Sequence, residues 1–301
     1  MKFKTVIYLV LLGAIWGSSF LFQRITVPEI GAGMTGAGRM ALAALALFGA
    51  ILVLRKRLDW RARWRDYLIV GSIVMGLPLL CFAFAARSLP AGYLAVLNAT
   101  VPMFAVLITA LQGGKPSLSK WAGVFVGILG VATLVKFGPI ELTLPVALGF
   151  GATLCATLMY AIGAILVRQR FGKADPLATT AGNLIGGTLP LLPLAVATAP
   201  VVLPSLGVAL ALIALGIVCT AVAYALYFRV LADAGVERAT TVTFLVPLFA
   251  QLWGALFLHE PVTWASAGGC ALVLFAVALI FERVPGIKPR PAAPVPALAV
   301  K

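Results

Sequence analysis

The chain has few charged residues, few carboxylates and a single histidine. Of its 301 residues only 11% are charged, Asp and Glu together number 9, and 62% of the side chains are hydrophobic. An ordinary soluble protein carries about 25% charged and roughly 45 to 50% apolar residues. This composition excludes a soluble globular fold and predicts a membrane protein.

The few acidic and histidine side chains do not form the clusters that catalysis or metal binding requires. No Asp or Glu lies near the middle of an apolar run, and His259 lies at the end of one. There is no H-E-x-x-H motif, and the 4 cysteines lack the spacing of a zinc site. We therefore expect no enzymatic activity, no metal and no cofactor. The lack of a mid-membrane carboxylate or histidine also favours a gradient-driven facilitator or exchanger over a proton pump, while ion coupling stays open.

Long apolar runs fill most of the chain. A helix rises about 1.5 Å per residue and the hydrocarbon core of a bilayer is about 30 Å thick, so a run of about 20 apolar residues can cross it once. We predict ten spans, at residues 5–22, 34–54, 67–86, 92–111, 119–135, 146–167, 176–197, 207–228, 239–258 and 263–281.

The charges behind the net charge of +14 are divided unequally between the two sides of the membrane in the predicted topology. If the N-terminus lies in the cytoplasm, most of the 23 Lys and Arg residues fall in inner segments, and the outer segments hold only Arg24, Arg87 and Lys136. Short loops rich in Lys and Arg are cytoplasmic. The pattern predicts a multi-pass protein of the bacterial inner membrane with both termini in the cytoplasm. The basic charge then faces the lipid bilayer, and no nucleic-acid partner is needed to explain it.

The second half of the chain repeats the first. Residues 101–129 align without a gap with residues 246–274, and the identical pairs include Val101/Val246, Pro102/Pro247, Phe104/Phe249, Pro116/Pro261 and Gly123/Gly268. Each repeat holds five spans, and because five is odd the second copy enters the membrane from the opposite side. Lys115 and its counterpart Glu260 differ in charge, as expected for loops on opposite sides.

The predicted fold is therefore an all-α integral membrane protein with ten transmembrane helices. The two inverted five-helix repeats comprise residues 1–138 and 139–285, and residues 286–301 are predicted to be a flexible cytoplasmic tail. Glycine-rich stretches predict close helix packing, either within the chain or at a dimer seam, although a monomer suffices. These stretches hold Gly123, Gly127 and Gly130, and Gly182, Gly186 and Gly187.

A proline interrupts one span of each repeat near its middle. Pro102 and Pro247 each remove a backbone donor and free the carbonyl four residues earlier, which belongs to Asn98 and Thr243 respectively. Inverted-repeat transporters commonly place the substrate site or the hinge at such interrupted helices. We predict that both prolines act as hinges and that Asn98 and Thr243 contact substrate. The alternative is a packing kink that a neighbouring helix satisfies.

Other polar and aromatic side chains lie too deep for the membrane surface. Trp16, Ser19, Tyr160, Tyr224 and Gln251 belong to helical stripes that lipid cannot satisfy, so we predict that they face a substrate cavity. Hydrogen bonding between helices is the alternative for a hydroxyl group.

Arg39 is the only charged residue well inside a predicted span. The guanidinium either contacts a substrate carboxylate or has a structural role, reaching the surface and capping helix ends.

Several sequence segments together resemble the drug/metabolite transporter superfamily, specifically its EamA-type ten-helix exporters. They are residues 14–20 (AIWGSSF), Arg39, the spans of Pro102 and Pro247, and residues 259–264 (HEPVTW). The resemblance covers nearly the whole chain, and it implies a secondary transporter with cytoplasmic termini, a central cavity between the repeats and export of amino acids or related metabolites. Amino-acid exporters, including the branch for aromatic amino acids, are the most similar part of the family.

These observations predict an inner-membrane secondary transporter that exports amino acids, preferably hydrophobic or aromatic ones, or related metabolites, by alternating access. A broad-specificity drug exporter and a non-transporting receptor or scaffold are the alternatives. The scarcity of Lys and Arg inside the membrane disfavours sugar phosphates, whose charges require several cations.

Overall fold

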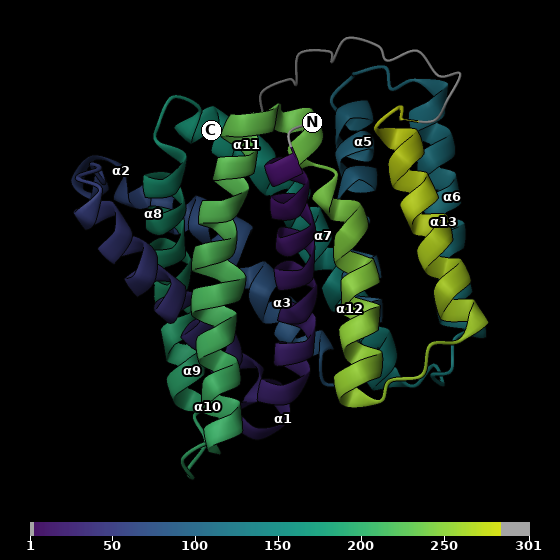
Figure 1. The fold of residues 1–301 in the computed structure, drawn as a ribbon, viewed down its shortest axis with the longest axis horizontal. Coiled ribbons are helices and arrows are strands. Elements are labelled where there is room, and N and C mark those ends of the chain that lie inside the picture. The colour runs from purple at the N-terminus through teal and green to yellow at the C-terminus, as the bar shows by residue number, and fades with distance from the viewer. Residues whose placement is uncertain (1–2, 284–301) are drawn as a thin grey trace.

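The computed structural model describes residues 3–283, and this part of the chain is built of helices, without strands (Figure 1). The elements are α1 (Phe3–Val53), α2 (Trp60–Gly71), η1 (Ser72–Gly76), α3 (Leu77–Ala85), α4 (Ala91–Asn98), α5 (Val101–Leu111), α6 (Leu118–Phe137), α7 (Leu144–Phe171), α8 (Pro176–Thr188), η2 (Leu189–Leu191), α9 (Leu192–Ala197), α10 (Leu206–Ile213), η3 (Ala214–Val222), α11 (Ala223–Ala239), α12 (Val242–Leu258) and α13 (Trp264–Ile280). The predicted tail, residues 286–301, lies outside the described residues.

The described helices confirm the ten predicted spans. Seven helical stretches are long and apolar enough to cross a bilayer, and α12 and α13 are shorter apolar helices of 17 residues each. The first stretch contains two spans, because α1 is interrupted at Gly31. The composition explains this architecture, since a helix satisfies all its backbone polar groups internally and lipid cannot satisfy them.

The connection between the first two spans is shorter than the sequence suggests. We predicted a loop between residues 22 and 34, but the first helix continues through Pro28 and only Gly31 leaves the helical conformation, with φ 73° and ψ 166°. Glycine reaches positive φ without the steric penalty of a Cβ atom, so a single residue is enough to separate the two helices.

The glycine-rich stretches pack against other helices of the same chain. A methyl group at Gly123 would lie 2.6 Å from the Ile280 side chain of α13, and one at Gly130 would lie 2.8 Å from Val273. On α8, Gly186 lies against the backbone of Tyr67 in α2. These faces hold α6 to α13 and α8 to α2 within the protein, as the packing interpretation predicts.

The two repeats pack along α1 and α12, which lie side by side in the middle of Figure 1. Gly17 of α1 lies against Phe249 of α12, and the Trp253 indole donates a hydrogen bond of 3.0 Å to the Ala14 carbonyl oxygen. The small residues of α1 let the two backbones approach closely, as is usual between membrane helices.

A π-helical segment occurs at the same place in each repeat. The offset that aligns Pro102 with Pro247 places residues 72–76, which form η1, onto residues 217–221, which lie within η3. π-Helical turns are rare and occur frequently at functional sites. Neither segment was predicted from the sequence.

Candidate functional site

A cavity of about 900 Å³ lies between the two repeats. Its walls come from α1, η1, α3, α4, α5 and α6 of the first repeat and from α7, η3, α11, α12 and α13 of the second. Pockets of roughly 300 to 1,000 Å³ bind small organic molecules. The residues predicted for the site that line this cavity are Trp16, Ser19, Arg39, Asn98, Pro102, Tyr160, Tyr224, Thr243 and Pro247.

Gln251 is the one predicted site residue that does not line the cavity. It borders a separate pocket of about 20 Å³, next to Glu260, and its side chain packs against Gly92 of α4. Gln251 lies two turns beyond Thr243 on α12, which is about 12 Å along the helix axis. The structure therefore brings together the polar residues near Pro247 and leaves Gln251 beyond the end of the cavity.

The two predicted hinge prolines have different surroundings. Pro102 is the second residue of α5, directly after the helical break at Ala99 and Thr100 that separates α4 from α5. Pro247 lies inside α12, which continues without interruption from Val242 to Leu258.

One end of the cavity reaches the surface between α5 and α6. Exposed Lys115, together with Ser117 and Lys120, lines this end, which we call the basic end. In Figure 1 the α5–α6 connection is at the top of the bundle, and the α12–α13 connection is at the bottom.

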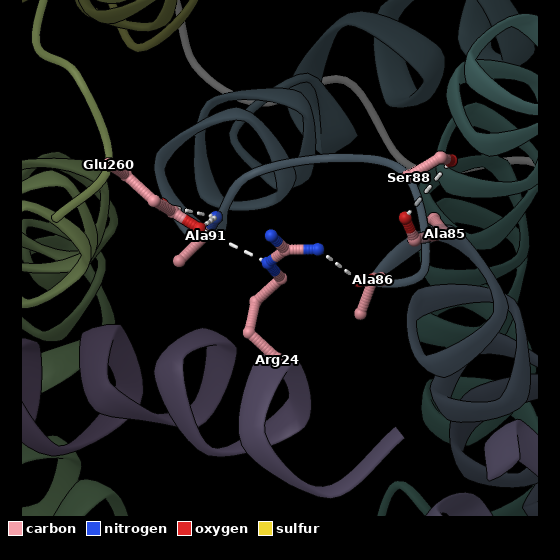
Figure 2. Close-up of polar contacts among 6 residues, drawn as sticks. All are labelled: Arg24, Ala85, Ala86, Ser88, Ala91 and Glu260. Carbon is pink, nitrogen blue, oxygen red and sulfur yellow. Dashed lines mark hydrogen bonds and ion pairs between the residues drawn. The ribbon is translucent and has the colours of Figure 1, made fainter. Parts of the chain in front are cut away.

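On the side of the α12–α13 connection an ion pair joins the two repeats, and we call it the Arg24–Glu260 lock (Figure 2). Arg24 Nε of α1 lies 3.1 Å from Glu260 Oε1, and Arg24 Nη1 donates a hydrogen bond of 2.8 Å to the Ala86 carbonyl oxygen. The Ala91 N–H, the first of α4, donates to Glu260 Oε2 at 2.9 Å and to Oε1 at 3.2 Å. Four separate parts of the chain thus meet at one carboxylate and one guanidinium.

The turn after α12 places Glu260 in the lock. His259 adopts a left-handed conformation with φ 53°, and the Glu260 N–H donates to the Gly254 carbonyl oxygen at 3.1 Å, which ends the helix. The Glu260 side chain is only 12% exposed and that of Arg24 29%. Burial raises the pKa of Glu260 above its usual value, and the Arg24 guanidinium and the Ala91 N–H oppose this rise.

No pattern in the sequence predicts the lock. Arg24 and Glu260 fall on the same side of the predicted topology, but nothing local pairs two residues that are 236 positions apart. The available signal was their opposite charge on a side with few charged residues.

Aromatic rings form much of the cavity wall near mid-depth. The Trp16 ring packs edge-to-face on Tyr224 with centroids 6.1 Å apart and contacts Tyr227 at 5.5 Å, and the Tyr160 ring stacks on Phe82 at 6.1 Å. Such pairs stabilise one another beyond their apolar contact area. The wall is therefore a preformed apolar surface that suits a flat or hydrophobic group.

Arg39 is a buried cation in the same wall. Its side chain comes from the second half of α1, the residue is 7% exposed, and Nε donates a hydrogen bond of 2.9 Å to Thr220 Oγ1 of η3. The Thr220 hydroxyl in turn donates to the Leu215 carbonyl oxygen at 2.8 Å. The π-helical segment therefore positions the hydroxyl that holds the guanidinium.

Among residues 3–283, no group of three or more His, Cys, Asp or Glu side chains is placed to hold a metal ion. The 4 cysteines, Cys81, Cys155, Cys219 and Cys270, are free thiols.

Comparison with known proteins gives consistent matches over nearly the whole chain. The model of the EamA-like transporter family matches residues 3–136 and again residues 147–282. Protein PecM of Dickeya dadantii is 28% identical over 293 residues, which cover 91% of this chain and 93% of that protein. The uncharacterized transporter YoaV of Bacillus subtilis is 24% identical over 276 residues, covering 90% and 94% of the two chains. One solved crystal structure shares the fold with a TM-score of 0.65 at 17% identity, covering 93% of this chain and 96% of that one.

Proposed function

The chain belongs to the EamA-like transporter family, and on this premise we propose that it exports hydrophobic or aromatic amino acids, or related small metabolites, across the bacterial inner membrane by alternating access. Membership of the family and the ten spans make it a multi-pass membrane transporter of small molecules. The substrate class, the direction and the mechanism are the proposal.

The observation that carries the proposal is a large cavity between the repeats whose basic end reaches the surface, while an ion pair joins the repeats on the opposite side. Lys115 and Lys120 line the basic end, and we interpret the Arg24–Glu260 lock as the closure of the other end. Alternating access requires a central site that opens to one side at a time, and inverted repeats supply two related conformations for it. With the basic end in the cytoplasm, as the distribution of Lys and Arg predicts, the cavity is ready to receive a solute from inside the cell.

The cavity wall suggests the substrate class. Trp16, Tyr160 and Tyr224 offer apolar and aromatic surface, and their faces can receive an ammonium group by cation–π contact. Asn98 and Thr243 add hydrogen-bonding groups near the mid-span prolines, which we propose as hinges. A hydrophobic or aromatic amino acid matches this mixture of one apolar body and a small polar end.

The test is counterflow of labelled phenylalanine into proteoliposomes preloaded with unlabelled amino acids, without an ion gradient. We expect saturable uptake that preloading with tryptophan, methionine or threonine supports to different degrees. Liposomes containing the folded protein but preloaded with buffer alone provide the control. Equal uptake with and without preloading would contradict an amino-acid exchanger, and competition by bulky lipophilic cations would favour a drug exporter instead.

A further inference from the structure

Arg39 presents unused hydrogen-bond donors to the transport cavity. Its Nε group is engaged by Thr220 at 2.9 Å, which leaves the two terminal NH₂ groups of the guanidinium. The residue lines the cavity and is 7% exposed, so the charge is held in the wall rather than extended to the membrane surface.

Residues 3–283 supply no carboxylate to this guanidinium. Arg39 takes part in none of the ion pairs that the described residues form, and the described lining of the cavity contains no Asp or Glu. Its electrostatic neighbours are Cys219, Tyr160 and Tyr224. A charged side chain inside a membrane is unfavourable unless it is paired, and such residues usually mark a substrate pathway. The site is therefore complementary to an anion that comes from outside the chain.

The surroundings define the kind of anion. Two parallel N–H groups of a guanidinium match the two oxygens of a carboxylate. Trp16 and Tyr224 pack on each other at 6.1 Å, so an apolar or aromatic body can lie next to the charged end. The other cations of the described lining, Lys115 and Lys120, belong to the basic end. Among the described residues, Arg39 is therefore the cation of the deep part of the cavity.

The same lining gives a substrate ammonium group no counter-ion. Only neutral groups, such as the aromatic faces, are available to it within the described residues. The carboxylate therefore finds a fixed partner of opposite charge, and the amino group does not.

We propose that Arg39 binds the carboxylate of the transported solute and that the protein recognises monocarboxylates with an apolar or aromatic body, whether or not they carry an amino group. This inference rests on the proposed function, since it names the feature of the substrate that the transport cavity selects. Thr220 is a positioning residue, because it holds the guanidinium through Nε.

The test measures binding to the full-length protein in detergent, with labelled 3-phenylpropanoate as the probe. Phenylalanine, phenethylamine and inorganic phosphate are the unlabelled competitors. We expect 3-phenylpropanoate to bind and phenylalanine to compete, while phenethylamine, which lacks the carboxylate, competes at least tenfold more weakly. Equal or stronger competition by phenethylamine, stronger competition by phosphate, or no binding of 3-phenylpropanoate would overturn the proposal.

Variants then test the residue itself. Arg39→Gln should weaken 3-phenylpropanoate binding about tenfold to hundredfold, because a charge-assisted pair is lost, and Arg39→Lys should retain part of the affinity. Arg87→Gln is the matched control, since it removes an exposed arginine that lies outside the cavity lining. If Arg39→Gln fails to fold, the competitor series on the unaltered protein still tests whether the cavity selects the carboxylate, and Arg39→Lys tests the residue.

Binding and transport results separate the two proposals. Binding of 3-phenylpropanoate without phenylalanine counterflow would support the role of Arg39 and contradict the proposed amino-acid exchange. Phenylalanine counterflow that is unchanged in Arg39→Gln would support the exchange and overturn the role of Arg39.

Discussion

Removing Arg24 should open the closed end of the cavity. Arg24→Gln deletes the cation of the Arg24–Glu260 lock and its hydrogen bond to the Ala86 carbonyl oxygen. Glu260 then keeps the Ala91 N–H, but its carboxylate is only 12% exposed and has lost its counter-ion. A buried charge without a partner destabilises the conformation that buries it, so the state in which Glu260 is hydrated is favoured.

The size of the effect follows from the exposure of the two side chains. Breaking a fully buried pair costs about 3 to 5 kcal/mol, whereas exposed pairs contribute about 0 to 1 kcal/mol. With Glu260 at 12% and Arg24 at 29% exposure, the lock lies between these limits, and we expect about 1.5 to 3 kcal/mol. This corresponds to a tenfold to hundredfold rise in the population that is open on the Arg24 side.

The assay is the labelling rate of a cysteine in the cavity by a membrane-impermeant thiol reagent applied from the Arg24 side. Ser19→Cys serves as the reporter, because Ser19 lines the cavity and is 4% exposed in the closed conformation. The background lacks the four native cysteines. Arg24→Gln should raise the labelling rate at least tenfold, and Arg87→Gln, which removes an exposed charge from the same side, should not.

Because Glu260 is titratable, the labelling rate of the Arg24→Gln variant should depend on pH. Burial already raises the pKa in the presence of Arg24, and loss of the guanidinium raises it further. A carboxyl whose pKa is higher in the closed state stabilises that state at low pH and loses this effect as the pH rises through the pKa. Acidification should therefore slow labelling in Arg24→Gln relative to the Arg24→Gln/Glu260→Gln double variant. Equal labelling in Arg24→Gln and the parent would refute the reasoning.

Three further substitutions test the hinge, the packing and the charge difference between the ends. Pro247→Ala should slow counterflow more than it weakens substrate binding if Pro247 is a hinge, and unchanged turnover at normal expression would make it a packing residue. Gly186→Ala should destabilise the protein by about 1 to 3 kcal/mol in thermal unfolding, because its neighbour is backbone that cannot rotate away, whereas Gly151→Ala meets open space and serves as the control. Lys115→Glu should slow labelling of the cavity reporter from the basic end, because a carboxylate there can pair with Arg168, which an offset of 144 residues relates to Arg24 of the lock. An unchanged rate would show that the two ends close differently.

The spans could be predicted from the sequence because the bilayer imposes their length and apolar character. The cavity residues followed from depth, since Trp16, Tyr160 and Tyr224 lie too far from the surface to anchor there. The position of Gln251 outside the cavity could not be predicted, because helical spacing shows which face of α12 a residue lies on but not how far the cavity extends. The Arg24–Glu260 lock depends on how spans far apart in the chain pack, which no local pattern encodes.

The two repeats share a fold but differ in charge at their ends, and this difference bears on which conformation is stable. The repeat relates Lys115 to Glu260 and Arg168 to Arg24. At one end the related pair is a guanidinium and a carboxylate, which attract and hold the two repeats together. At the other end the pair is two cations, which repel if the same movement brings them together. The related folds of the two repeats therefore allow two conformations. The charges favour the conformation in which the basic end is open.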